Sequence, residues 1–305
     1  MTGGIKQKKT SITYGLSPGE KVFGAVNFII LAILGLLMLF PFVNLIAKSF
    51  SSNTAITTGQ VSFWPVGFQT GTYRYVMRQN QFWNSFKISL IVTVCGTFGA
   101  LLMSCITAYS LSKRWLYARK FFVLIFVFTM LFSGGMVPSY ILMRALNIVN
   151  TIWVLIVPAL LGVYNMILLK NFFEEIPEAV EESAQLDGAG SIRILFSIVL
   201  PMSLPALATI GLFYAVGFWD NYMTGLLYIT TPSLRPLQTY LYQLVTDATN
   251  ISADIMTAED MEAASLNTEA IRAATIMLAC VPIMCVYPFL QKYFVKGMRV
   301  GSVKG

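Results

Sequence analysis

Six long apolar stretches alternate with polar segments along this chain. They cover approximately residues 22–47, 84–111, 121–143, 151–169, 202–229 and 273–293. As helices that rise about 1.5 Å per residue, all of them come close to or exceed the roughly 30 Å hydrocarbon core of a bilayer. The pattern therefore predicts an all-α integral membrane protein with six transmembrane helices, in which residues 22–305 form a single membrane domain.

Glycine and proline interrupt two of the predicted spans. Ser133-Gly134-Gly135 and Pro138 lie in the third span, and Pro158 and Gly162 lie in the fourth. Such residues are tolerated in a membrane where neighbouring helices or a water-filled cavity satisfy the freed backbone groups. For the third span, close helix packing through small residues explains them equally well, so both interpretations stay open there.

Polar segments flank and separate the spans. Residues 1–21 carry four lysines and are predicted to be a cytoplasmic tail. The span that follows exceeds the roughly 7–15 apolar residues of a signal peptide, so it is interpreted as an uncleaved anchor. Residues 48–83 are rich in aromatic side chains and predict an external loop with a short helix along the membrane surface. Residues 230–271 are acidic and predict a second external segment, with one helix that faces a partner. That helix would carry Leu237, Tyr240, Leu241, Leu244 and Val245.

The distribution of charge predicts the orientation of the chain. The sequence is 56% hydrophobic and 11% charged, with a formal net charge of +7. Of its 21 lysines and arginines, 14 lie in the tails and loops that six spans would place on the same side as both termini. The positive-inside rule makes this the cytoplasmic side. Because the cations are scattered at the ends of apolar runs, they do not indicate a nucleic-acid partner.

Composition also argues against several kinds of chemistry. The sequence has no histidine, and its four cysteines all lie within apolar spans, without CxxC spacing. We therefore expect no metal site and no disulfide. There is no G-x-x-x-x-G-K-[ST] loop, so the chain is not itself an ATPase. No nucleophile–base pattern indicates an enzyme, and no cofactor is expected in this chain.

One acidic residue stands inside an apolar span. Asp220 lies in the run GFWDNY (217–222) of the fifth span. A charge at membrane depth is costly unless it is paired or hydrated, so it indicates a functional site. Aromatic rings beside acids and amides are also what a sugar site requires. We predict a substrate pathway that includes Trp219, Asp220, Asn221, Tyr222, Tyr164 and Asn165. The alternative is that Asp220 pairs with a neighbouring helix or caps a broken one.

The polar connection between the fourth and fifth spans, residues 171–201, is predicted to have its own structure. It begins with an acidic run formed by Glu174, Glu175, Glu178, Glu181 and Glu182. Ile176-Pro177 opens a helical run, because proline fits a first helical turn and acids favour a helix N-terminus. Asp187-Gly188 is a turn signal, and a second short helical pattern follows it. The prediction is two short helices joined by a tight glycine turn; a solvated acidic loop is the alternative.

The order of residues in this connection resembles the EAA signature of ABC-importer membrane subunits, E-A-A-x-x-D-G-A. The chain carries Glu182-Ser183-Ala184 and Asp187-Gly188-Ala189, so Ser183 is the one departure from that run. The resemblance implies coupling helices that dock in a cleft on an ATP-hydrolysing subunit. It assigns ATPase-coupling roles to Glu182, Ala184, Asp187, Gly188 and Ala189. Glu182 would be the acid that pairs with the ATPase, and Gly188 would form the turn.

Within this class the chain is most similar to MalG-type permeases of carbohydrate importers, in the LplC/YtcP-like subgroup. The runs LFSGGMVPSYILMRALNIVNTIWVLIVP and QKYFVKGMRVGSVKG add to the match. The resemblance implies the type I ABC importer permease fold and ATP-driven import of an oligosaccharide by alternating access across a bacterial cell membrane.

The same resemblance implies several partners. These are a homologous second permease subunit, two cytoplasmic ATPase subunits that bind ATP and Mg²⁺, and an extracytoplasmic solute-binding protein. Two alternatives remain at this point. One is an importer of a non-sugar solute such as a peptide. The other is an ATP-independent secondary transporter, which would need ion or proton sites inside the membrane; a single acid and no histidine argue against it.

Overall fold

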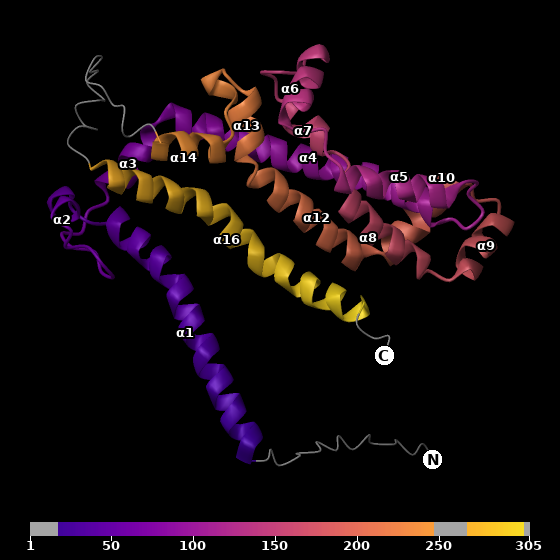
Figure 1. The fold of residues 1–305 in the computed structure, drawn as a ribbon, viewed down its shortest axis with the longest axis horizontal. Coiled ribbons are helices and arrows are strands. Elements are labelled where there is room, and N and C mark those ends of the chain that lie inside the picture. Colours follow the sequence, from indigo (N-terminus) through magenta and orange to yellow (C-terminus); the bar gives the residue numbers. More distant parts are fainter. Residues whose placement is uncertain (1–17, 247–266, 302–305) are drawn as a thin grey trace, which may run out of the picture.

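The computed structural model describes residues 18–246 and 267–301, and all regular secondary structure in these ranges is helical (Figure 1). In chain order the elements are α1 (Pro18–Ser49), α2 (Asn53–Thr57), α3 (Gly71–Arg78), α4 (Asn80–Ser112), α5 (Arg119–Leu131), α6 (Met136–Ala145), α7 (Trp153–Ile156), η1 (Val157–Ala159), α8 (Val163–Glu174), α9 (Glu178–Leu186), α10 (Ser191–Ile194), the π-helical η2 (Leu195–Val199), α11 (Leu200–Met202), α12 (Leu204–Trp219), α13 (Tyr222–Tyr228), η3 (Pro232–Leu234), α14 (Leu237–Thr246) and α16 (Thr268–Gly301).

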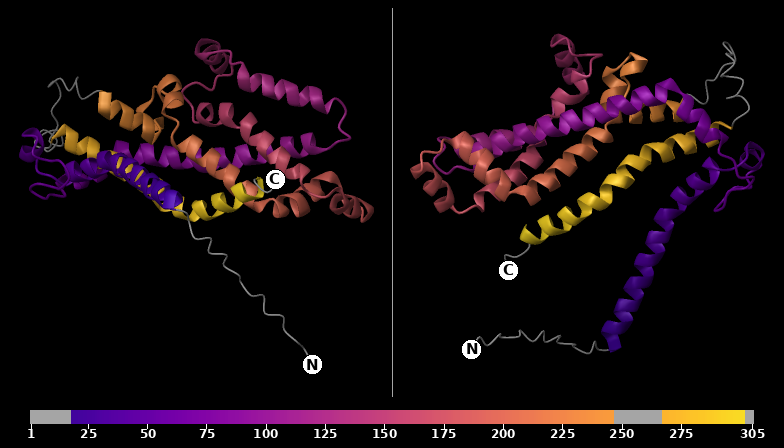
Figure 2. Two further views of the ribbon diagram at one scale, coloured as in Figure 1. Left: turned by 60° about the horizontal axis from the view of Figure 1, so that its bottom comes forward. Right: turned by 180° about the vertical axis from the view of Figure 1, so that it is seen from behind.

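Long helices form the body of the molecule. In Figures 1 and 2, α12 lies between α4 and α16, and α8 packs against α4. The short helices α2, α3 and α14 gather at one end of this body, and α9 and α10 lie at the other. Helix α1 contacts α16 at the end that leads into α2 and diverges from it toward Pro18.

Small residues on α4 allow its neighbours to approach closely. A Cβ atom added to Gly96 would lie 2.8 Å from the ring of Phe218 on α12, and one added to Gly99 would lie 2.8 Å from Leu160. Both distances are far below van der Waals contact, so only glycine fits without a shift. Gly134 and Gly135 in the third predicted span, by contrast, have no such close neighbour. Within the described part of this chain, therefore, no helix packs closely against these two glycines, and both interpretations stay predictions.

The number of membrane-crossing helices depends on how bent pairs are counted. Among the described residues, Gly19–Ser49 and Asn80–Ser112 are single helices that are long and apolar enough to cross a membrane. Three bent pairs of helices also qualify, which makes up to five. The sixth predicted span, 273–293, lies on α16, whose side chains beyond Cys285 are outside the described part. Six crossings therefore stay a prediction.

Three of the predicted spans are not single straight helices. The third, 121–143, is divided into α5 and α6, whose axes differ by 112°. Gly135 stands at the break with φ +88°, a conformation that glycine adopts at no steric cost. The fifth, 202–229, is divided at Asp220 and Asn221 into α12 and α13, and an 88° bend at Ser203 separates α12 from the helices before it. The glycines and the proline of the third span predicted an interruption of its helix, but the direction of the bends could not be predicted from the sequence.

The fourth predicted span, 151–169, bends by 46° between η1 and α8. Gly162 stands at the bend, and its backbone N–H donates to the Tyr214 hydroxyl at 2.9 Å. The same hydroxyl donates back to the Gly162 carbonyl oxygen at 3.3 Å and lies 2.6 Å from the Ser104 hydroxyl. Tyr214 on α12 and Ser104 on α4 are both buried. The phenol thus satisfies the backbone N–H that the bend leaves without a helical partner, and it shares the Gly162 carbonyl oxygen with the Met166 backbone N–H, which donates to it at 2.9 Å.

The acidic external segment contains the one predicted helix, α14. Its residues Leu237 and Leu241 are buried against Val76, Phe82 and other core side chains rather than presented to a partner, which corrects that prediction. The tail 1–17, residues 247–266 and residues 302–305 lie outside the described residues, so the cytoplasmic tail and most of the acidic loop stay predictions.

Candidate functional site

The polar connection (residues 171–201) folds into the predicted pair of short helices joined by a glycine turn. Helix α9 precedes the turn, and α10 follows it and continues into η2 and α11. The limits differ from the prediction in two respects. Residues 171–174 form the last turn of α8, and Pro177 is the N-cap of α9 rather than its first helical residue. The connection lies at one end of the helical body (Figure 1).

Gly188 ends α9 through a hydrogen-bonded turn. The backbone N–H of Gly188 donates to the carbonyl oxygen of Gln185, and that of Ala189 donates to the carbonyl oxygen of Ala184, both at 2.9 Å. These two bonds define a Schellman motif, which requires a left-handed residue just after the helix cap. Asp187 is the cap, and Gly188 has φ +81°. Four of the five predicted coupling residues therefore form this turn.

The fifth, Glu182, is exposed and has no ion pair within the described part of the chain. Large apolar side chains are exposed around it: Leu186 is 89% exposed and Ile192 is 77% exposed. Phe196 is also exposed. Apolar side chains gathered on a structured turn, at the end of the molecule away from α14, indicate an interaction surface rather than a solvated acidic loop.

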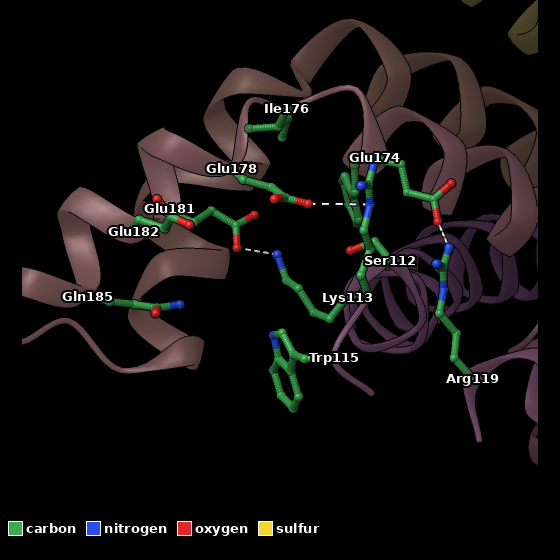
Figure 3. A pocket seen from close by; sticks show the side chains of 12 residues that line it. Ser112, Lys113, Trp115, Arg119, Glu174, Ile176, Glu178, Glu181, Glu182 and Gln185 are labelled. Carbon is green, nitrogen blue, oxygen red and sulfur yellow. Dashed lines mark hydrogen bonds and ion pairs between the residues drawn. The ribbon is translucent and has the colours of Figure 1, made fainter. Parts of the chain in front are cut away.

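Other glutamates of the connection bind cations in the loop between α4 and α5 and at the start of α5 (Figure 3). The pairs are Lys113–Glu181, Arg114–Glu178 at 3.4 Å and Arg119–Glu174, and Lys170 also lies 2.8 Å from Glu174. In the sequence these cations served only to indicate the cytoplasmic side. In the structure Lys113 and Arg114 bind α9 to the end of α4, and Arg119 joins the start of α5 to the end of α8.

A polar cavity of about 500 Å³ lies between this loop and α9 (Figure 3). Its walls carry Lys113, Arg114 and Arg119 together with Glu174, Glu178, Glu181 and Glu182. Charges of both signs line the cavity, and most of them are already paired. It therefore lies at a contact between helices and is not a site selective for a charged ligand.

The six predicted substrate-pathway residues do not lie in one place. Trp219 is buried in a core cluster with Leu237 and Leu241, and its indole N–H has no hydrogen-bond partner within the described residues. Asn221 caps α13, because its side-chain oxygen accepts hydrogen bonds from the backbone N–H and the hydroxyl of Thr224 at 3.2 and 2.8 Å. The predicted alternative placed a cap of a broken helix at Asp220. Asp220 is the C-cap residue of α12, and the side-chain cap of α13 is made by its neighbour Asn221.

The other four line two separate pockets. Asp220 and Tyr222 border a pocket of about 390 Å³ between the break after α12 and the helices α14 and α16. Here the Gln238 side chain donates to Asp220 at 3.4 Å. Tyr164 and Asn165 border a pocket of about 560 Å³ beside the bend at Gly162. We call these the Asp220 pocket and the Tyr164 pocket. A role in substrate passage stays a prediction for both.

Comparison with known protein families gives the class to which this chain belongs. Residues 22–300 match the family described as "Binding-protein-dependent transport system inner membrane component". The chain belongs to this family. It is therefore a membrane-embedded transport permease subunit, not an enzyme.

Individual relatives agree with this assignment over nearly the whole chain. The polygalacturonan/rhamnogalacturonan transport system permease protein YtcP of Bacillus subtilis is 39% identical over 287 residues, covering 94% of this chain and 99% of that protein. Protein LplC of the same organism is also 39% identical over 287 residues, covering 93% and 96%. A chain in the crystal structure of a bacterial ABC transporter involved in the import of the acidic polysaccharide alginate has a TM-score of 0.85 and 33% identity, covering 92% and 99%. The predicted resemblance to the LplC/YtcP-like subgroup is confirmed.

Proposed function

We propose that this chain is the membrane-spanning permease subunit of an ATP-driven importer that takes up an oligosaccharide delivered by an extracytoplasmic binding protein. The observation that carries the proposal is the exposed helix–turn–helix around Gly188 in a chain of this transport family. The chain has no nucleotide-binding loop, so ATP and Mg²⁺ bind to separate ATPase subunits.

The helix–turn–helix is the element that meets an ATPase. Leu186 and Ile192 supply an apolar contact surface, and Glu182 supplies an unpaired charge next to it. When two ATPase subunits close on ATP, they draw this element and its counterpart on a second, homologous permease together. The helices then rearrange so that the pathway opens outward, and hydrolysis resets them. The binding of solute and the binding of nucleotide thereby bias the same two states.

The positive-inside distribution supports cytoplasmic termini and six crossings, with the helix–turn–helix on the cytoplasmic side. Lipid and the second permease cover the apolar surfaces that this chain leaves open. The most apolar 18-residue window of α1 contains no buried residue, although Ala47 and Ser49 at the end of the helix are buried, and α5 contains no buried residue.

The substrate class rests on the relatives. YtcP is named for polygalacturonan and rhamnogalacturonan, and the transporter of similar structure imports alginate. These names support an oligosaccharide, and acidic glycans are the first candidates to test. Vesicles that contain this chain, a second permease, the ATPase and the binding protein should take up oligogalacturonides or alginate oligomers. Uptake should require both ATP and the binding protein. Stimulation of ATP hydrolysis by a peptide-loaded binding protein, with no uptake of any glycan, would contradict the sugar assignment.

The Asp220 pocket offers a narrower prediction. Asp220→Ala should raise the concentration of glycan-loaded binding protein needed for half-maximal uptake by about tenfold, because a hydrogen bond to a charged group contributes about 1.5–3 kcal/mol. Glu269→Gln is the matched control, since Glu269 is an exposed acid that pairs with Lys48 at 2.8 Å, outside this pocket. Equal half-saturation in wild type, Asp220→Ala and the control would remove Asp220 from the pathway.

A further inference from the structure

Helix α9 has little apolar contact with the rest of the chain. Its only buried residues are Glu181 and Ala184. Burial of one alanine side chain removes little apolar surface from water, and a helix of this length is marginal without outside contacts. Apart from its covalent ends, α9 is therefore held in position mainly through its acidic side chains.

The contact at Glu181 is the enclosed one. Lys113, the residue that caps the C-terminal end of α4, pairs with Glu181, and the two side chains are 14% and 12% exposed. The Lys113 ammonium also lies 4.1 Å from the centroid of the Tyr109 ring, and the Tyr109 hydroxyl donates to the same Glu181 oxygen at 3.5 Å. An enclosed pair with additional partners has a fixed geometry and is weakly screened by salt.

A second pair on the same two elements provides an internal comparison. Arg114 and Glu178 lie 3.4 Å apart, but their side chains are 83% and 70% exposed. Pairs as open to water as this contribute little, because solvent screens the charges and both long side chains lose freedom. Of the two ion pairs between α9 and the end of α4, only Lys113–Glu181 can transmit a displacement.

Helix α4 connects that pair to the middle of the molecule. It runs without a break through Asn80–Ser112, and Ser104 on it lies 2.6 Å from the Tyr214 hydroxyl. Tyr214 in turn holds both backbone groups of Gly162 at the bend beside the Tyr164 pocket. A rigid helix therefore joins the end that carries α9 to the one hydroxyl that holds this bend.

We propose that Lys113 and Glu181 are positioning residues for transport: their enclosed ion pair is the joint through which movement of α9 reaches α4 and, along α4, the bend at Gly162. The joint rests on the proposed function, because it links the ATPase-facing helix to the solute pathway. Coupling between two sites is reciprocal. The same ion pair therefore also transmits the effect of the binding protein, on the opposite side of the membrane, to ATP hydrolysis.

The test uses the complete complex in proteoliposomes, with its binding protein loaded with an oligogalacturonide mixture. The variants are Lys113→Met, Glu181→Gln, the exchange Lys113→Glu with Glu181→Lys, and the exposed control Arg114→Met. Three quantities are measured: co-purification of the ATPase, basal ATP hydrolysis, and the ratio of stimulated to basal hydrolysis. Either single variant should lower this ratio at least fivefold while co-purification and basal hydrolysis stay within twofold. The exchange should restore at least half of the ratio, and Arg114→Met should leave it within twofold.

Two results would refute the proposed role of the Lys113–Glu181 ion pair. The joint is refuted if Lys113→Met keeps the wild-type ratio. It is also refuted if co-purification, basal and stimulated hydrolysis all fall together and the exchange restores none of them, because that is the behaviour of a purely structural contact. Wild-type hydrolysis that no binding protein stimulates overturns the proposed function itself. Wild-type stimulation without glycan uptake overturns only the substrate, and the variants still test the joint.

Discussion

Replacement of Gly188 by valine should abolish ATP-dependent uptake while the chain still inserts into the membrane. Gly188 has φ +81° in the turn between α9 and α10. L-residues disfavour this conformation, and β-branched side chains tolerate it least. The two backbone hydrogen bonds of the Schellman motif depend on that conformation, so the turn must open and α10 must leave its position relative to α9.

Gly190, two residues further on, is the matched control. A Cβ atom added at either glycine meets nothing within 4 Å, so neither substitution creates a clash. Gly190 has φ −72°, however, which any residue adopts. Gly190→Val should keep uptake within about threefold of wild type, whereas Gly188→Val should lower it more than a hundredfold. Uptake in vesicles, normalised to the amount of inserted chain, measures both. Equal uptake in the two variants would show that the turn geometry is irrelevant to coupling.

Replacement of Glu182 by alanine should have an effect of similar size for a different reason. Glu182 is exposed and unpaired among the described residues, so its removal takes nothing from the fold of this chain. In the complex it would face a cation of the ATPase. Loss of one member of a buried ion pair costs about 3–5 kcal/mol, because the other charge stays buried without compensation. At about 1.4 kcal/mol per factor of ten, uptake should fall at least a hundredfold.

Glu178→Ala is the control for this substitution. It removes the same charge from the same helix, but the partner of Glu178 is the exposed Arg114 of its own chain. That variant should keep uptake within about twofold. Co-purification with the ATPase separates the two causes of a loss: Glu182→Ala should weaken it, and assembly with the second permease should be unchanged. Normal uptake by Glu182→Ala would remove this residue from the ATPase contact.

The parts of the fold that depend on local chemistry were predictable from the sequence. Gly188 is recognisable because the glycine follows a helical pattern and an aspartate, and few residues other than glycine accept the left-handed conformation. The apolar stretches likewise predicted the positions of α1 and α4. In both cases the information lies in residues that are neighbours in the sequence.

The parts of the structure that depend on contacts between distant residues could not be predicted from the sequence. Glu181 meets Lys113 across 68 residues, and nothing near either residue selects one glutamate of the acidic run over another. The directions of the bends in the third to fifth predicted spans could not be predicted either, because the direction of a bend depends on what packs against it. Trp219 illustrates the same limit: an aromatic ring beside Asp220 predicts a sugar contact equally well whether the helix turns it outward or, as here, into the core.

The hydroxyl that holds the Gly162 bend has a consequence for biosynthesis. Ser104 precedes Gly162 in the chain, but Tyr214 follows Gly162 by 52 residues. At a synthesis rate of roughly 5–20 residues per second, the bend must wait about 3–10 seconds for its partner to leave the ribosome. During that interval the Gly162 amide has to be satisfied by water or by the insertion machinery, whereas its carbonyl can already accept from the Met166 backbone N–H. The fourth segment should therefore become stable in the bilayer only after α12 has arrived beside it.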